Sequence, residues 1–171
     1  MKLVAFASSV FVLFLATQCS MPGNTLGFYA VTGNVQTNSC GAGLGAPSPW
    51  KFNVEISKDT SKLYWNTMDG SPLLVGQVTG NSVSLDDDEG GYADTGPDGG
   101  PGACIMQRDE TISLTLDSPT KPKSFTGTLT YQFSVASGSD CADQMAAQGG
   151  IYDTLPCTLS YGVSGSFNGT N

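Results

Sequence analysis

The sequence predicts an all-β domain, an antiparallel meander of about eight or nine strands that closes into a barrel. Apolar and polar residues alternate in four separate segments, which is the pattern of strands with one buried and one solvated face. Short stretches rich in glycine and turn-forming residues separate most successive strands, as in a meander. Closing the sheet removes its exposed edges, so the sequence favours a barrel over the alternative, a two-layer β-sandwich.

The first segment of the chain is expected to be an export signal, and the alternative is a buried N-terminal strand or helix. Lys2 precedes a short apolar run from Leu3 to Ala16, and this arrangement is typical of a secretory signal peptide. The run is shorter than the roughly 20 apolar residues that a membrane-spanning helix needs. We therefore expect residues 1–19 to be a signal peptide and residues 20–171 to form a single β domain.

The end of this signal resembles the lipobox of bacterial lipoproteins. Leu15-Ala16-Thr17-Gln18-Cys19 places a cysteine just past the apolar run, where such proteins carry their lipidated first residue. We expect lipid attachment at Cys19, and the alternative is cleavage after Cys19 by a general signal peptidase. Lipidation would place the protein in the bacterial cell envelope, at the outer membrane or in the periplasm. Cleavage would release it as a secreted protein.

The strands follow in order along the chain. Alternation is clearest at 50–56, 111–116, 125–135 and 157–167. Weaker patterns predict strands at 27–32, 62–66, 72–78, 81–85 and 104–107, with a hairpin turn at Gly80-Asn81 and a second turn at Arg108-Asp109.

An acidic, glycine-rich stretch at 86–102 interrupts the meander. It contains six acidic residues and no basic one, so it has little apolar surface to bury and we expect a disordered loop. Asp86, Asp88 and Asp94 are weak candidates for calcium ligands, because extracellular sites of millimolar affinity use such oxygens. Their spacing departs from the EF-hand loop, so we favour a solvated charge run and predict no metal.

A second insertion lies between the last two strands. Ser139 is a candidate N-cap for a short helix over 140–148, and Gly149-Gly150 would end that helix. The sequence therefore predicts one short helix just before the last strand.

Four cysteines remain once Cys19 is lipidated or removed. An even number without metal-site spacing predicts two disulfides in an oxidising compartment, and the four are Cys40, Cys104, Cys141 and Cys157. Three connectivities are open, and we favour Cys141 with Cys157 and Cys40 with Cys104.

Charge and composition argue against several classes of function. Seven Lys and Arg residues, Lys2 among them, stand against 15 Asp and Glu, which disfavours nucleic acid and anionic membrane surfaces as partners. The chain has no histidine, so a Ser-His-Asp or Cys-His site is excluded. No nucleotide-binding motif occurs, and we expect neither a cofactor nor enzymatic activity. Membrane contact would come through the lipid anchor alone.

Aromatic residues at apolar strand positions are the candidate ligand contacts. In a small barrel such side chains either fill the core or line a cavity, and the candidates are Trp50, Phe52, Trp65, Tyr131, Phe133 and Tyr161.

Two features resemble the lipocalins. Gly27-Phe28-Tyr29 is similar to the Gly-x-Trp motif on their first strand, with Tyr29 in place of the tryptophan, and the hairpins from Trp50 to Val135 resemble their meander. The resemblance implies an eight-stranded barrel that binds a small apolar ligand.

We therefore expect an exported, lipid-anchored barrel module that binds a small hydrophobic ligand. The alternative is a structural or protein-interaction lipoprotein of the cell envelope, with a filled core and no small-molecule ligand.

Overall fold

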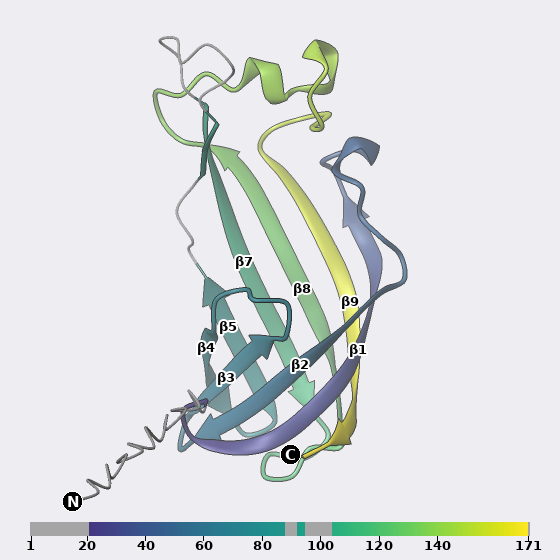
Figure 1. Cartoon of the computed structure of the whole chain (residues 1–171), viewed down its shortest axis with the longest axis vertical. Coiled ribbons are helices and arrows are strands. Elements are labelled where there is room, and N and C mark those ends of the chain that lie inside the picture. Colours follow the sequence, from purple (N-terminus) through teal and green to yellow (C-terminus); the bar gives the residue numbers. More distant parts are fainter. Residues whose placement is uncertain (1–20, 88–91, 95–103, 171) are drawn as a thin grey trace, which may run out of the picture.

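The chain folds into a closed antiparallel β-barrel (Figure 1). The computed structural model describes residues 21–87, 92–94 and 104–170, with the backbone alone at 92–94. The strands are β1 (Asn24–Asn38), β2 (Trp50–Asp59), β3 (Lys62–Thr67), β4 (Leu74–Thr79), β5 (Ser82–Asp87), β6 (Tyr92–Asp94), β7 (Cys104–Leu116), β8 (Ser124–Val135) and β9 (Cys157–Gly169).

Pairing between β5 and β7 closes the barrel. The sheet order is β5-β4-β3-β2-β1-β9-β8-β7-β6, and β5 also pairs with β7 from Ser82 opposite Thr115 to Asp87 opposite Glu110. Eight strands thus form the ring, while β6 lies outside it beside β7. The predicted meander barrel is confirmed, and the two-layer sandwich is wrong, because a sandwich would leave β5 and β7 as separate edges.

Inward-facing apolar side chains fill the ring. Tyr29 and Trp65 both contact the ring of Phe125, with centroid distances of 5.5 and 5.6 Å. Gly165 of β9 lies under the same ring, where any Cβ atom would collide with it. The Tyr29 hydroxyl donates a hydrogen bond of 2.8 Å to the carbonyl oxygen of Pro122, and burial, followed by the charge of Asp117, raises the Tyr29 pKa to about 12.

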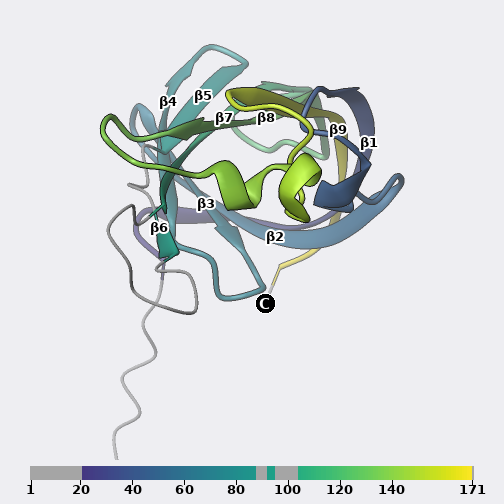
Figure 2. The same cartoon turned by 90° about the horizontal axis from the view of Figure 1, so that it is seen from above.

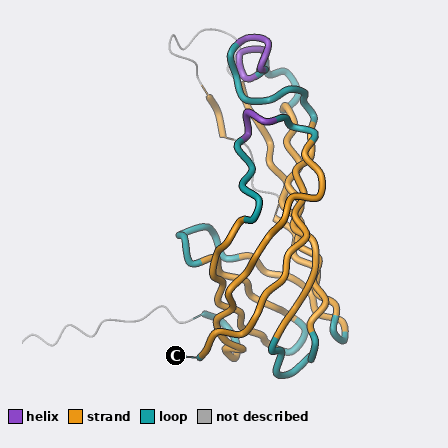
Figure 3. The backbone as a smooth tube through the Cα atoms, turned by 90° about the vertical axis from the view of Figure 1, so that its right-hand side faces the viewer, coloured by secondary structure: helices purple, strands orange, loops and turns teal. Residues whose placement is uncertain are grey.

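Four long strands continue past the ring. β2 begins at Trp50 opposite Gly33, and β5 ends at Asp87 opposite Glu110. Beyond these pairs the four long strands continue as an open sheet that we call the extension, the tall part of the molecule in Figures 1 and 3. It consists of residues 34–38, 104–109, 131–135 and 157–162, and β6 pairs with its β7 edge. We call the boundary between ring and extension the barrel mouth.

The segment between β8 and β9 lies above the extension (Figures 1 and 2). It contains two short 3-10 turns, η2 (Ala142–Gln144) and η3 (Ala146–Gln148), where the sequence predicted one helix over 140–148. Helical turns thus occur where they were predicted, but they do not form one continuous helix, because Met145 is extended between them and forms a β-bridge with Tyr152. Tyr152 is buried and packs on Phe133 of the extension at 5.6 Å.

Two disulfides hold the far end of the extension. They join Cys40 to Cys157 and Cys104 to Cys141, with Cα–Cα distances of 5.0 and 4.6 Å. The four predicted cysteines are confirmed as disulfide partners, but the favoured connectivity is wrong. The first and last strands of the barrel are neighbours, so Cys40 after β1 meets Cys157 at the start of β9. Cys141 then pairs with Cys104 at the start of β7.

Of the two turns and the loop that the sequence predicted, one turn is confirmed. The hairpin turn at Gly80-Asn81 is confirmed, with Gly80 at a φ of 61°. The turn at Arg108-Asp109 is wrong, because β7 runs without interruption through both residues. The loop predicted at 86–102 begins later, since Asp86 and Asp87 belong to β5, and it includes β6.

Several predictions concern parts of the chain beyond the description. The signal peptide at 1–19, with Cys19, lies outside the described residues, and so do 88–91 and 95–103 of the acidic loop. Their predicted export, lipidation and disorder stay predictions. Over the described ranges, no helix combines the length and the hydropathy needed to cross a bilayer.

Candidate binding site at the barrel mouth

Two charged residues occupy inward-facing positions of β7. Met106, Ile112 and Leu114 are buried on the inward face of this strand, and Arg108 and Glu110 fall at the same period between them. The Glu110 side chain is 14% exposed and that of Arg108 is 39% exposed, and the two form an ion pair of 3.9 Å. Burying a charge on the inner face of a barrel costs free energy unless the charge is paired or hydrogen-bonded.

A second carboxylate faces this pair from the neighbouring strand. Asp87 is the last residue of β5 and lies directly opposite Glu110 in the register. It follows Val83 and Leu85 on the inward face of β5. Like charges directly opposite each other destabilise a sheet, so β5 and β7 would gain from a cation held between these two side chains.

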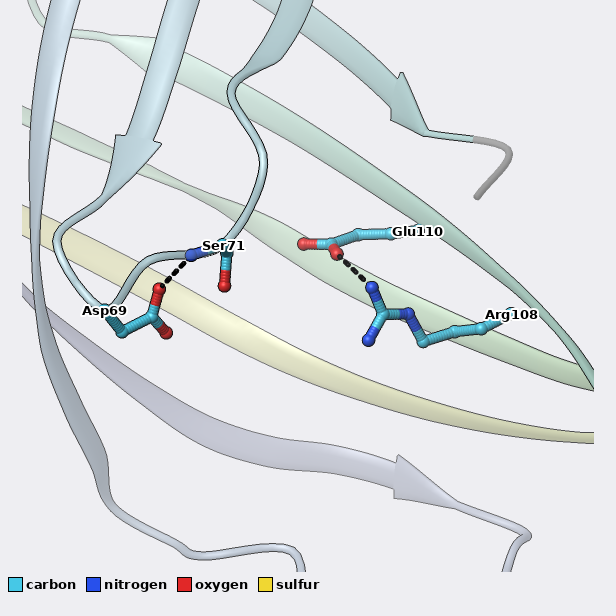
Figure 4. A network of polar contacts seen from close by, with 4 residues as sticks. All are labelled: Asp69, Ser71, Arg108 and Glu110. Atoms are coloured by element: carbon cyan, nitrogen blue, oxygen red, sulfur yellow. Dashed lines mark hydrogen bonds and ion pairs between the residues drawn. The ribbon is translucent and has the colours of Figure 1, made fainter. Parts of the chain in front are cut away.

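The β3–β4 loop adds a third carboxylate across the mouth. Asp69 accepts a hydrogen bond of 3.0 Å from the backbone N–H of Ser71, and both residues lie opposite Arg108 and Glu110 (Figure 4). Hydrogen bonds from the side chain and then from the backbone N–H of Ser71 lower the pKa of Asp69, against a smaller opposing effect of burial. Asp69 therefore carries its negative charge throughout the neutral range.

Aromatic side chains form the apolar wall of the mouth. Trp50, the first residue of β2, is half-buried and stacks on Phe52 with a centroid distance of 4.3 Å and an interplanar angle of 29°. Its ring also lies 5.3 Å from that of Tyr161. Tyr131 faces inward on β8, and the Arg108 guanidinium carbon lies 5.8 Å from its ring centroid.

Tyr131 and the buried Tyr161 both keep their hydroxyl protons. Burial, and next the charge of Glu110, raises the pKa of Tyr131 far above its ordinary value. Burial also raises the pKa of Tyr161. At neutral pH these hydroxyls are neutral groups that donate and accept hydrogen bonds.

These residues enclose a cavity of about 230 Å³ at the mouth. β2, β3, β4 and β5 each contribute a terminal residue, whereas β7 and β8 contribute residues from their middles. The lining residues are Trp50, Thr67, Asp69, Ser71, Pro72, Leu74, Asp87, Arg108, Glu110 and Tyr131. The cavity exists because the shorter strands stop here while the extension continues upward.

The six aromatic residues that the sequence singled out separate into two groups. Trp50 and Tyr131 line the cavity. The other four do not: Trp65, Phe133 and Tyr161 are buried core side chains, and Phe52 is half-buried and stacks on Trp50. Phe133 packs in the extension under Tyr152. Trp65 is 2% exposed, and its indole N–H has no hydrogen-bond partner among the described residues.

The charged residues of the site were not predicted from the sequence. The turn predicted at Arg108-Asp109 cut β7 in two and hid the inward period that joins Met106 to Ile112. Reading that period across the charges would have placed Arg108 and Glu110 inside the barrel. Asp69 gave no signal, because its place depends on how the β3–β4 loop folds over the mouth.

The lowered pKa of Asp69 bears on whether this carboxyl group could act as a general acid. Paired carboxylates can cleave glycosides when one of them has a raised pKa and acts as the general acid. The pKa of Asp69 is lowered, so this carboxyl group is a poor proton donor. Over the described side chains, no three ligating groups gather into a metal cluster; Asp86 is exposed on the outer face of β5, and the side chains of Asp88 and Asp94 lie outside the description.

Comparison of the chain with models of protein families, with curated proteins and with solved structures yields no significant match. The predicted closed eight-stranded meander is present, whereas the resemblance to lipocalins stays a prediction.

Proposed function

We propose that this protein is an exported barrel module that binds a small ligand at the barrel mouth. The single observation that carries the proposal is the cavity of about 230 Å³, which combines the aromatic surfaces of Trp50 and Tyr131 with charged side chains. Concave sites with apolar walls and a few convergent polar groups are the usual form of small-molecule sites.

The cavity limits the size of the ligand. Sites for drug-sized molecules enclose roughly 300–1,000 Å³, so a cavity of about 230 Å³ fits a smaller molecule. The ring below offers little further room, because Trp65, Phe125 and Tyr29 meet at its centre. The ligand would therefore sit at the mouth and not deep inside the barrel, and it would meet polar as well as apolar groups.

Export and anchoring belong to the same proposal. Two disulfides suit an oxidising compartment, and the sequence before the barrel resembles a lipoprotein signal ending at Cys19. A lipid at Cys19 would hold the barrel at a bacterial membrane surface. Binding without catalysis is the activity we expect there.

Native mass spectrometry of the protein purified from its own envelope, without reduction, tests this proposal. Thr67 lines the cavity, and Thr67→Trp should fill it. Thr115→Trp is the matched control, because Thr115 lies on the outer face of β7. We expect a non-covalent passenger on the wild type and on the control, and none on Thr67→Trp.

Bare protein with no passenger mass in all three cases would overturn the ligand proposal. The alternative, a solid envelope module that meets protein partners through its loops, would then stand, and its filled ring already agrees with the packing around Phe125. A diacylglycerol mass on a chain that begins at Cys19 would separately establish the anchor.

A further inference from the structure

We propose that the ligand of the barrel mouth is a small organic cation, an ammonium group attached to an apolar body. This inference rests on the proposed function and names the chemical class that the same cavity selects. It differs from the hydrophobic ligand that the aromatic residues alone suggest, because the structure places charged side chains beside them.

The charge balance of the cavity is negative. Its lining includes three carboxylates, Asp69, Asp87 and Glu110, against one guanidinium, Arg108. Glu110 pairs with Arg108 at 3.9 Å, so the formal charges of Asp69 and Asp87 remain to be balanced. The chain as a whole carries a formal net charge of −8, and this field favours the approach of cations over anions.

The pairing of β5 with β7 places two of these carboxylates side by side on the inner face of the barrel. Asp87 and Glu110 are directly opposed on β5 and β7, both at inward positions. Asp86, one residue earlier, is exposed on the outer face. Placing the second carboxylate inward costs stability through like-charge repulsion, and a bound cation would offset that cost.

The aromatic surfaces suit the same ligand. The face of a tryptophan attracts a cation more strongly than that of any other side chain, and Trp50 is half-buried at the rim of the cavity. Tyr131 already has a cation near its ring, since Arg108 lies 5.8 Å from its centroid. Leu74 and Pro72 add apolar surface for the rest of the ligand.

Anions and purely apolar molecules fit less well. An anion would meet Asp69 and Asp87, and Arg108 is already paired with Glu110. An apolar molecule would displace water from these carboxylates without replacing the hydrogen bonds that the water supplies, and this desolvation costs free energy. A cation with an apolar body satisfies both halves of the cavity.

Three probes of similar size and different charge test the inference: 2-phenylethylamine, 2-phenylethanol and phenylacetate. Titration calorimetry gives their affinities for the oxidised protein, and indole N–H resonances report the place of binding, because the chain has two tryptophans. Trp50→Phe assigns those two resonances. We expect the amine to bind about tenfold more tightly than the alcohol, phenylacetate to bind most weakly, and the Trp50 resonance to move.

Neighbouring residues of β5 provide a matched pair of variants. Asp87→Asn should weaken amine binding about three- to tenfold while leaving the affinity for the alcohol unchanged. Asp86→Asn removes the same charge from the outer face of the strand and should leave both affinities unchanged.

The outcomes separate this inference from the function on which it rests. If the alcohol binds at the Trp50 resonance as tightly as the amine, the mouth binds ligands but does not select cations, and this inference is wrong. If none of the three probes moves the Trp50 resonance at millimolar concentration, the binding function at the mouth is overturned as well. If Asp86→Asn and Asp87→Asn weaken amine binding equally, the preference for the amine comes from the net charge of the protein and not from the cavity. This result would also contradict the proposal.

Discussion

At the scale of single residues, the mouth depends on side chains whose protonation is fixed by their neighbours. Asp69 is largely exposed, yet its pKa is lowered, first by the side chain and then by the backbone N–H of Ser71. Tyr131 has the opposite shift, since burial and the nearby Glu110 disfavour its phenolate. Asp69 therefore stays charged and Tyr131 stays neutral across the physiological pH range. The charge that these two residues contribute to the cavity does not change with pH in that range.

Ser71→Ala should therefore raise the pKa of Asp69 toward its ordinary value, because the largest cause of the lowering is removed. The carboxyl carbon resonance of Asp69, followed by NMR between pH 2 and 6, measures the shift. A lowered pKa contributes stability above the unfolded-state value of about 3.9 and loses it as the pH falls through the folded value. The variant should lose that contribution at a higher pH than the wild type.

Ser61→Ala is the control for this titration, since Ser61 is an exposed serine in the turn between β2 and β3. An unchanged Asp69 titration in Ser71→Ala would show that the loop does not hold Asp69 as described. The aromatic half of the site was predictable at this scale, because Trp50 and Tyr131 stand in clear alternating segments. Asp69 was not, since an aspartate in a turn is common for local reasons alone.

At the scale of elements, β7 decides both the fold and the site. Its lower half closes the ring by pairing with β5, and its upper half carries Cys104 into the extension. The alternating pattern predicted strands on either side of a turn at Arg108-Asp109, but β7 continues through both residues. Local hydrophobicity is a poor guide where a strand carries charged side chains on its inward face.

The disulfide connectivity could not be derived from sequence for a related reason. Cys40 and Cys157 are 117 residues apart, and they meet because β1 and β9 close the ring side by side. Cys104 and Cys141, 37 residues apart, meet because the segment above the extension folds back toward β7. Both pairings follow from tertiary structure, which the spacing of the cysteines does not reveal.

Removing the two disulfides separately should have unequal effects. Restricting the longer loop lowers the entropy of the unfolded chain more, so the pair Cys40→Ser and Cys157→Ser should cost about 1 kcal/mol more than the pair Cys104→Ser and Cys141→Ser. Urea unfolding of the two double variants measures the difference. The reverse order of stability would contradict the connectivity, and mapping of unreduced peptides would identify the true partners.

At the scale of the whole molecule, closure of the ring distinguishes this fold from an open sheet. Alternation alone fits either, and the cost of exposed strand edges correctly favoured the barrel. The number of strands and their meander order were predictable because turn signals separate them. The height of the extension was not, since it depends on how far each pair of strands continues in register.

Closure makes a specific prediction for hydrogen exchange. β5 has β4 on one side and β7 on the other, so the consecutive amides of Val83, Ser84 and Leu85 should all be protected. An edge strand would leave every second amide open to solvent. Exchange measured by NMR residue by residue distinguishes the two, and fast exchange at alternate positions of β5 would mean that the ring is open.

The central claim is that the barrel mouth binds a small molecule, and a crystal structure of the protein isolated from its own envelope tests it most directly. We predict electron density for a compact organic molecule between Trp50 and Tyr131, with a polar group toward Asp69 or Asp87. The same barrel with the mouth closed by side chains, or with water alone beside Trp50, would contradict the claim.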